Sequence, residues 1–122
     1  MNKSGAVRVV VGAYPATGET ITVPIQGMLV GVGVNYNFGS VYSTALDLSI
    51  TGIGDNEPDQ DILAISGGNS SGWFYPVAPL HDQSGGVIAD QYTLGIPVFG
   101  NVEFLISNAQ PGDSVDFTIM LL

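Results

Sequence analysis

Hydrophobic and polar residues alternate with a period of two along most of this chain. In the segment 44–51, Leu46, Leu48 and Ile50 alternate with polar or small residues, and the segments 102–106 and 115–121 repeat the pattern. Because successive side chains of an extended strand point to opposite faces, this period predicts strands with one buried face. No stretch of ten residues keeps an amphipathic helical period without Gly or Pro, so long helices are not expected.

The longest alternating run covers residues 23–36. The pattern predicts that one face carries Met28, Val30, Val32, Val34 and Tyr36, and the other Leu29, Gly31, Gly33 and Asn35. Glycines on one face of a strand indicate a bend or a close approach of another group to the backbone.

Shorter apolar runs predict further strands at 6–11, 62–66, 73–75 and 94–98. The turn residues at 110–113 are expected to join the last two long strands as a hairpin or as neighbours. About eight short strands separated by turns are typical of an all-β, antiparallel β-sandwich or a small barrel. We expect a single sandwich domain over 6–122, a mobile N-terminal arm over 1–5, and a long loop over 77–93 with a helical turn near Asp90.

The charge balance excludes several classes of partner. The net charge is −9, and Lys3 and Arg8 are the only basic residues. Nucleic acids and anionic membranes are bound largely through Lys and Arg, so neither is expected as a partner. Exposed strand edges are often protected by lysine, but this chain has no lysine after Lys3. Its strand edges are therefore either covered by neighbouring subunits or protected by Gly, Pro and bulges.

The sequence offers little for catalysis. Cysteine is absent and His81 is the only histidine, which excludes thiolate zinc sites, multi-histidine metal sites and cysteine nucleophiles. The segment 68–72 matches G-x-S-x-G, but an aromatic strand and Pro76 follow where a hydrolase needs a helix. His81 and Asp82 could form an acid–base pair, but no nucleophile accompanies them, and a structural role in the loop is favoured. We expect no enzymatic activity and no cofactor.

One acidic run has the spacing of metal ligands. Asp55, Glu57, Asp59 and Asp61 alternate along the chain, and oxygen ligands at alternating positions can converge on Ca²⁺. Gln60 occupies the position of the EF-hand glycine, and Pro58 interrupts the run. The alternative is a solvated loop between two strands, so these four residues are a weak calcium candidate only.

The most distinctive segment is Trp-Phe-Tyr-Pro-Val-Ala-Pro-Leu-His-Asp at 73–82. With the alternating strands around it, over roughly residues 44–121, it resembles small all-β head decoration (cement) proteins of tailed bacteriophages. Val77 departs from the pattern, because relatives often carry a basic residue there. The resemblance implies a jelly-roll-like sandwich in the virion that forms a homotrimer, binds the major capsid protein on the outer capsid surface and stabilises the head.

The same segment supplies the candidate interface and loop-anchoring residues. Trp73 and Tyr75 are expected to share one face of a strand, with Phe74 opposite. Pro76 is expected to stiffen the exit of that strand, and His81 with Asp82 to tie down the long loop. At the N-terminus, an arm that carries Lys3 and Arg8 could become ordered on acidic groups of the shell. Ordinary core and turn positions are the alternative for the 73–82 residues.

Two other functions remain open at this stage. One is a different virion role, as an accessory β-domain at the head–tail junction or in a tail or fibre. The other is a carbohydrate-binding β-sandwich in which Trp73 or Tyr75 stacks on a sugar and the acidic loop holds Ca²⁺.

Overall fold

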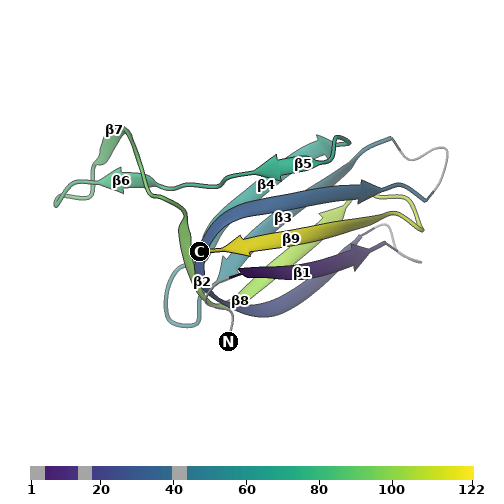
Figure 1. Ribbon diagram of the computed structural model, residues 1–122, viewed down its shortest axis with the longest axis horizontal. Coiled ribbons are helices and arrows are strands. Elements are labelled where there is room, and N and C mark those ends of the chain that lie inside the picture. Colours follow the sequence, from purple (N-terminus) through teal and green to yellow (C-terminus); the bar gives the residue numbers. More distant parts are fainter. Residues whose placement is uncertain (1–4, 14–17, 40–43) are drawn as a thin grey trace.

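The computed structural model describes residues 5–13, 18–39 and 44–122, and all regular structure in these ranges is β (Figure 1). Within them, no helix could span a membrane. The strands are β1 (Gly5–Gly12), β2 (Glu19–Asn37), β3 (Leu46–Ile53), β4 (Gln60–Gly68), β5 (Gly72–Phe74), β6 (Pro79–His81), β7 (Val87–Tyr92), β8 (Ile96–Ser107) and β9 (Ser114–Leu121). All pairings between them are antiparallel.

The long strand β2 takes part in both layers of the sandwich. Its first part, from Glu19 to Leu29, pairs with β8, and its second part, from Leu29 to Asn37, pairs with β9. One four-stranded layer therefore has the order β4-β3-β8-β2, and the other has the order β1-β9-β2-β5. This is the strand order of a jelly roll in which two strands are fused into one, and it confirms the predicted antiparallel sandwich.

A β-bulge between Leu29 and Gly31 marks the point where β2 passes from one layer to the other. The extra residue shifts the alternation by one position, so Ile25 and Leu29 are buried before the bulge and Val32 and Val34 after it. The prediction that Met28 shares a face with Val32 is therefore wrong, because the bulge exchanges the two faces.

The core lies between the two layers. Phe104 of β8 and Phe117 of β9 are fully buried, and their ring centroids are 5.2 Å apart. The alternating residues Leu46, Leu48 and Ile50 of β3 are buried as predicted.

The turn at 110–113 joins the two layers rather than forming a hairpin. Both β8 and β9 pair with β2 and not with each other, so the expectation that they are neighbours is wrong. Asp113 is buried, and its carboxylate accepts hydrogen bonds from the amides of Gly39 and Gln110 at 2.9 Å each. Its carbonyl accepts from the Ala13 amide at 2.8 Å. Asp113 thus ties three chain segments together at this end of the sandwich, two through its carboxylate and one through its carbonyl.

A hairpin projects from the sandwich between β5 and β8 (Figure 1). We call residues 77–94 the arm. In the described part of the chain, its strands β6 and β7 pair only with each other. The arm replaces the predicted long loop, and Asp90, with φ of 61°, lies in β7 rather than in a helical turn.

The N-terminal boundary also differs from the prediction. Gly5 already pairs with Leu121, and Arg8 lies inside β1, opposite Thr118. The mobile N-terminal segment that was expected over 1–5 therefore does not include Gly5, and Arg8 is not part of it. Residues 1–4, with Lys3, are outside the described residues.

Candidate functional site

The outer face of the β1-β9-β2-β5 layer combines aromatic and polar side chains. The strand register places the outward residues in three rows across the sheet. The first row holds Val10, Asp116, Asn35 and Ser71; the second Arg8, Thr118, Gly33 and Trp73; the third Ala6, Met120, Gly31 and Tyr75. We call this surface the aromatic face.

Two glycines make room for the two rings of the aromatic face. A Cβ on Gly33 would lie 3.1–3.2 Å from three consecutive atoms of the Trp73 six-membered ring, Cη2, Cζ2 and Cζ3. Such nearly equal distances mean that the indole lies face-on above Gly33. Tyr75 lies against Gly31, with two ring carbons 3.5 Å from the position of a Cβ. The predicted close approach at these glycines is confirmed.

Both rings nevertheless remain open to solvent on their other side. Trp73 is 49% exposed and Tyr75 66% exposed, whereas Phe74 points inward and packs against the core. This confirms the prediction that Trp73 and Tyr75 share one face, with Phe74 opposite. Among the described residues, no protein group accepts a hydrogen bond from the indole N–H of Trp73, so this donor is available to a ligand.

The polar groups beside Trp73 are held in place by one another. The Ser71 hydroxyl donates to Asn35 Oδ1 at 3.1 Å and accepts from the Tyr36 amide at 3.0 Å. Arg8 Nε donates to Asp116 Oδ1 at 2.9 Å, and Arg8 Nη2 donates to Oδ2 of the same carboxylate. A two-point contact of this kind fixes the planes of both groups.

The ion pair also shifts both pKa values. Hydrogen bonding to Arg8 lowers the pKa of Asp116, against the opposing effect of partial burial, and Coulombic attraction adds to the lowering. The hydrogen bond to Asp116, followed by its charge, raises the pKa of Arg8. Both groups therefore stay ionised around neutral pH, and together they carry no net charge.

Between these groups lies a shallow pocket of about 460 Å³. Its lining includes Trp73, Asn35, Ser71, Thr118 and the Arg8–Asp116 pair. A flat ring surrounded by a few oriented polar groups is typical of a site that binds a small or extended ligand. The aromatic face offers donors, acceptors and a stacking surface, but no paired acid and nucleophile.

The arm is the second candidate surface. Val77, Leu80, Val87, Tyr92 and Leu94 are all exposed, Leu94 by 75%. They account for five of the eleven large hydrophobic side chains that are exposed among the described residues. Several uncovered apolar side chains on one projecting element are typical of a protein contact.

The base and the tip of the arm are fixed by hydrogen bonds. At the base, the Ala78 amide donates to Thr93 Oγ1 at 2.9 Å, and the Thr93 amide donates to the Ala78 carbonyl at 2.8 Å. At the tip, Asp82 Oδ1 accepts from the amides of Ser84 and Gly86 at 2.9 Å each. The predicted anchoring role is thus observed for Asp82, whereas His81 lies exposed in β6.

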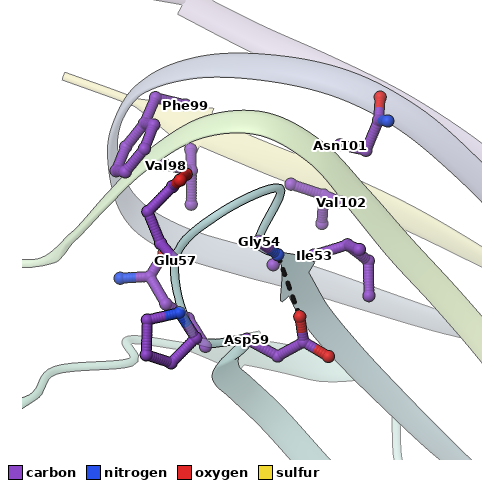
Figure 2. Close-up of a pocket in the computed structure, with 11 residues that line it drawn as sticks. Ile53, Gly54, Glu57, Asp59, Val98, Phe99, Asn101 and Val102 are labelled. Carbon is purple, nitrogen blue, oxygen red and sulfur yellow. Dashed lines mark hydrogen bonds between the residues drawn. The ribbon is translucent and has the colours of Figure 1, made fainter.

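Of the acidic run, Asp55, Glu57 and Asp59 lie in the loop between β3 and β4, and Asp61 lies in β4. Glu57 and Asp59 border a smaller cleft of about 250 Å³ against β8. Figure 2 shows this loop closed by the Gly54 amide, which donates to Asp59 Oδ1 at 2.9 Å. Glu57 Oε2 accepts from the Asn56 amide. Two of the four candidate carboxylates, Glu57 and Asp59, thus accept hydrogen bonds from their own loop. In the described ranges, no three His, Cys, Asp or Glu side chains are grouped so that they could hold a metal ion.

Of the residues proposed from sequence, Arg8, Trp73 and Tyr75 come together on the aromatic face, while Pro76 follows β5 and leads into the arm. Sequence reasoning missed Asn35, Ser71 and Asp116, which are ordinary polar positions in the sequence. Only the pairing of four strands places them beside Trp73.

Comparisons with protein-family models, with curated proteins and with solved structures give no match to this chain.

Proposed function

We propose that this protein is a bacteriophage head decoration protein, a non-enzymatic virion component that binds the major capsid protein on the outer surface of the head and stabilises it. The arm is the observation that carries this proposal. A protein that assembles with copies of itself on the capsid can use a projecting apolar element for these contacts, and residues 77–94 present one. The resemblance of residues 73–82 and the jelly-roll fold are consistent with the same role.

We propose further that the arm contacts a second copy of this chain, and that three copies form a ring. A two-stranded hairpin is only marginally stable by itself in water. The arm therefore gains most from a partner that covers Val87, Tyr92 and Leu94.

The oligomeric state is the first test. The base of the arm permits a clean deletion, because Ala78 and Thr93 are already hydrogen-bonded across it. Residues 79–92 can be replaced by Asn-Gly, which favours a tight hairpin turn. Light scattering on an eluting size-exclusion peak should give the mass of three 12.7 kDa chains for the full protein and of one for the deletion. A full-length monomer at high concentration would contradict the preformed trimer.

The location on the particle is the second test. Phage particles are purified by density gradient from a lysate that contains this protein, and antibodies to it are used for labelling. We expect labelling over the outside of the heads. Heads stripped of the protein should release DNA at a lower temperature, and adding back the full chain, but not the arm deletion, should restore the release temperature. Labelling confined to tails or fibres, or recovery only in the soluble fraction, would contradict a head decoration role.

A further inference from the structure

We infer that the aromatic face binds a neutral glycan, with one pyranose ring stacked on the outer side of the Trp73 indole. This inference concerns a surface other than the arm and does not rest on the proposed function. The ligand class follows from three properties of the site, which are the orientation of the rings, the hydrogen-bonding groups beside them and the charge of the chain.

The orientation of the rings suits stacking rather than insertion. Gly33 lets the indole of Trp73 lie on the sheet, so it turns one face outward, and Tyr75 packs against Gly31 beside it. The two glycines are two residues apart on β2, which separates the ring positions by roughly 6.6 Å along the strand. Gluco-configured pyranoses carry axial C–H groups on both faces and equatorial hydroxyls. Such a ring can lie flat on an aromatic side chain with its hydroxyls directed sideways.

The equatorial hydroxyls of a sugar stacked on Trp73 would lie close to polar groups whose orientation is already fixed. Asn35 keeps its amide N–H donors free while its oxygen accepts from Ser71. Arg8 uses Nε and Nη2 for Asp116, which leaves the Nη1 donors for a ligand. Because these groups are fixed before binding, little ordering of side chains is needed when a ligand arrives.

The charges of the pocket and of the whole chain favour a neutral sugar over an anionic one. Among the described residues that line the pocket, Arg8 and Asp116 compensate each other, and no further cation is present to bind a carboxylate or a sulfate. The chain as a whole carries a net charge of −9, which repels anionic polysaccharides. Across four strands spaced by about 4.8 Å, the face extends about 14 Å, which accommodates more than one linked sugar ring.

The test uses the fact that Trp73 is the only tryptophan of the chain, so tryptophan fluorescence reports on this site alone. The full protein is titrated with cellohexaose and with maltohexaose as neutral probes, and with hexagalacturonic acid as an anionic comparator. We expect a saturable change of Trp73 emission and protection from acrylamide quenching with at least one neutral hexasaccharide, and neither effect with the acid.

Three variants locate the site. Asn35→Ala retains the fluorophore and should weaken binding about tenfold through the lost hydrogen bond. Trp73→Ala, followed by titration calorimetry, should abolish binding. Tyr92→Ala removes an exposed aromatic side chain of the arm and should leave binding unchanged. Circular dichroism melts of each variant check that the sandwich remains folded.

The inference is overturned if neither neutral hexasaccharide changes Trp73 emission at about 10 mM, or if Trp73→Ala binds as tightly as the natural chain. It is also overturned if Trp73 emission shifts with protein concentration and not with saccharide, because the aromatic face would then be a contact between copies.

Discussion

The sandwich and the arm use similar residues in opposite ways. In the sandwich, apolar side chains such as Phe104 and Ile50 are fully buried between two layers. In the arm, Val87 and Tyr92 belong to the same residue classes but are 63% and 59% exposed. In the sandwich, each layer is covered by the other, whereas no second layer covers the arm among the described residues. This difference indicates that the sandwich is stable through its own contacts and that the arm needs a partner to cover its apolar side chains.

The largest expected effect comes from the core. Phe104→Ala removes a fully buried ring that packs on Phe117 and should lower the free energy of unfolding by about 3–5 kcal/mol. The matched arm variant, Tyr92→Ala, should change it by no more than about 0.5 kcal/mol at protein concentrations where the chain is monomeric, because the ring is exposed in the single chain. Urea unfolding followed by circular dichroism measures both. Equal losses from the two variants would show that the arm contributes to the stability of the folded chain as much as the core does, which would contradict the difference described above.

The second effect concerns the turn that closes the sandwich. Asp113→Ala leaves the amides of Gly39 and Gln110 without their acceptor and should cost about 1–3 kcal/mol. Asp113→Asn keeps one acceptor oxygen and should cost less. If both variants unfold at the same urea concentration as the natural chain, the carboxylate does not join the layers as described.

The third effect is a pH dependence on the aromatic face. Arg8 lowers the pKa of Asp116, so this carboxylate stabilises the fold above its ordinary pKa of about 3.9. That stability is lost as the pH falls through the lowered pKa. Arg8→Ala should therefore melt at a lower temperature than the natural chain at pH 7, and the difference should vanish in strong acid.

Asp47 provides an internal reference for this measurement. Hydrogen bonds from the Gly67 amide and then from Asn108 lower its pKa in the same direction, and they are present in both proteins. The melting temperatures of both proteins should therefore still fall as the pH is lowered. A difference between the two proteins that stays constant from pH 7 to pH 2 would contradict a role for the ion pair.

The smallest effect is confined to the arm. Asp82→Ala removes the acceptor for Ser84 and Gly86 and should loosen the tip without changing the free energy of unfolding measurably. Hydrogen exchange should be faster at these two amides and unchanged in β8. Faster exchange throughout β8 would show that the arm and the sandwich open together.

The alternation of residues was enough to predict β3 and β9, because each has one face on the core and one outside, and the period of two survives in the sequence. It was also enough to place Trp73 and Tyr75 opposite Phe74. It failed at the bulge of β2, because one inserted residue exchanges the faces without any change in composition. It failed in the arm too, where β6 and β7 have no buried face and therefore no alternation to detect.

The sequence alone therefore predicted the all-β class, strands of the core, a bend or close approach at Gly31 and Gly33, and the restriction of lysine and arginine to Lys3 and Arg8. Only the tertiary structure decided that β2 joins both layers, that residues 77–94 form a projecting hairpin, and that Arg8, Asn35 and Trp73 lie on one face. The physical reason is that local periodicity reports the burial of each side chain, whereas strand pairing between distant segments depends on hydrogen bonds and packing that no single segment encodes.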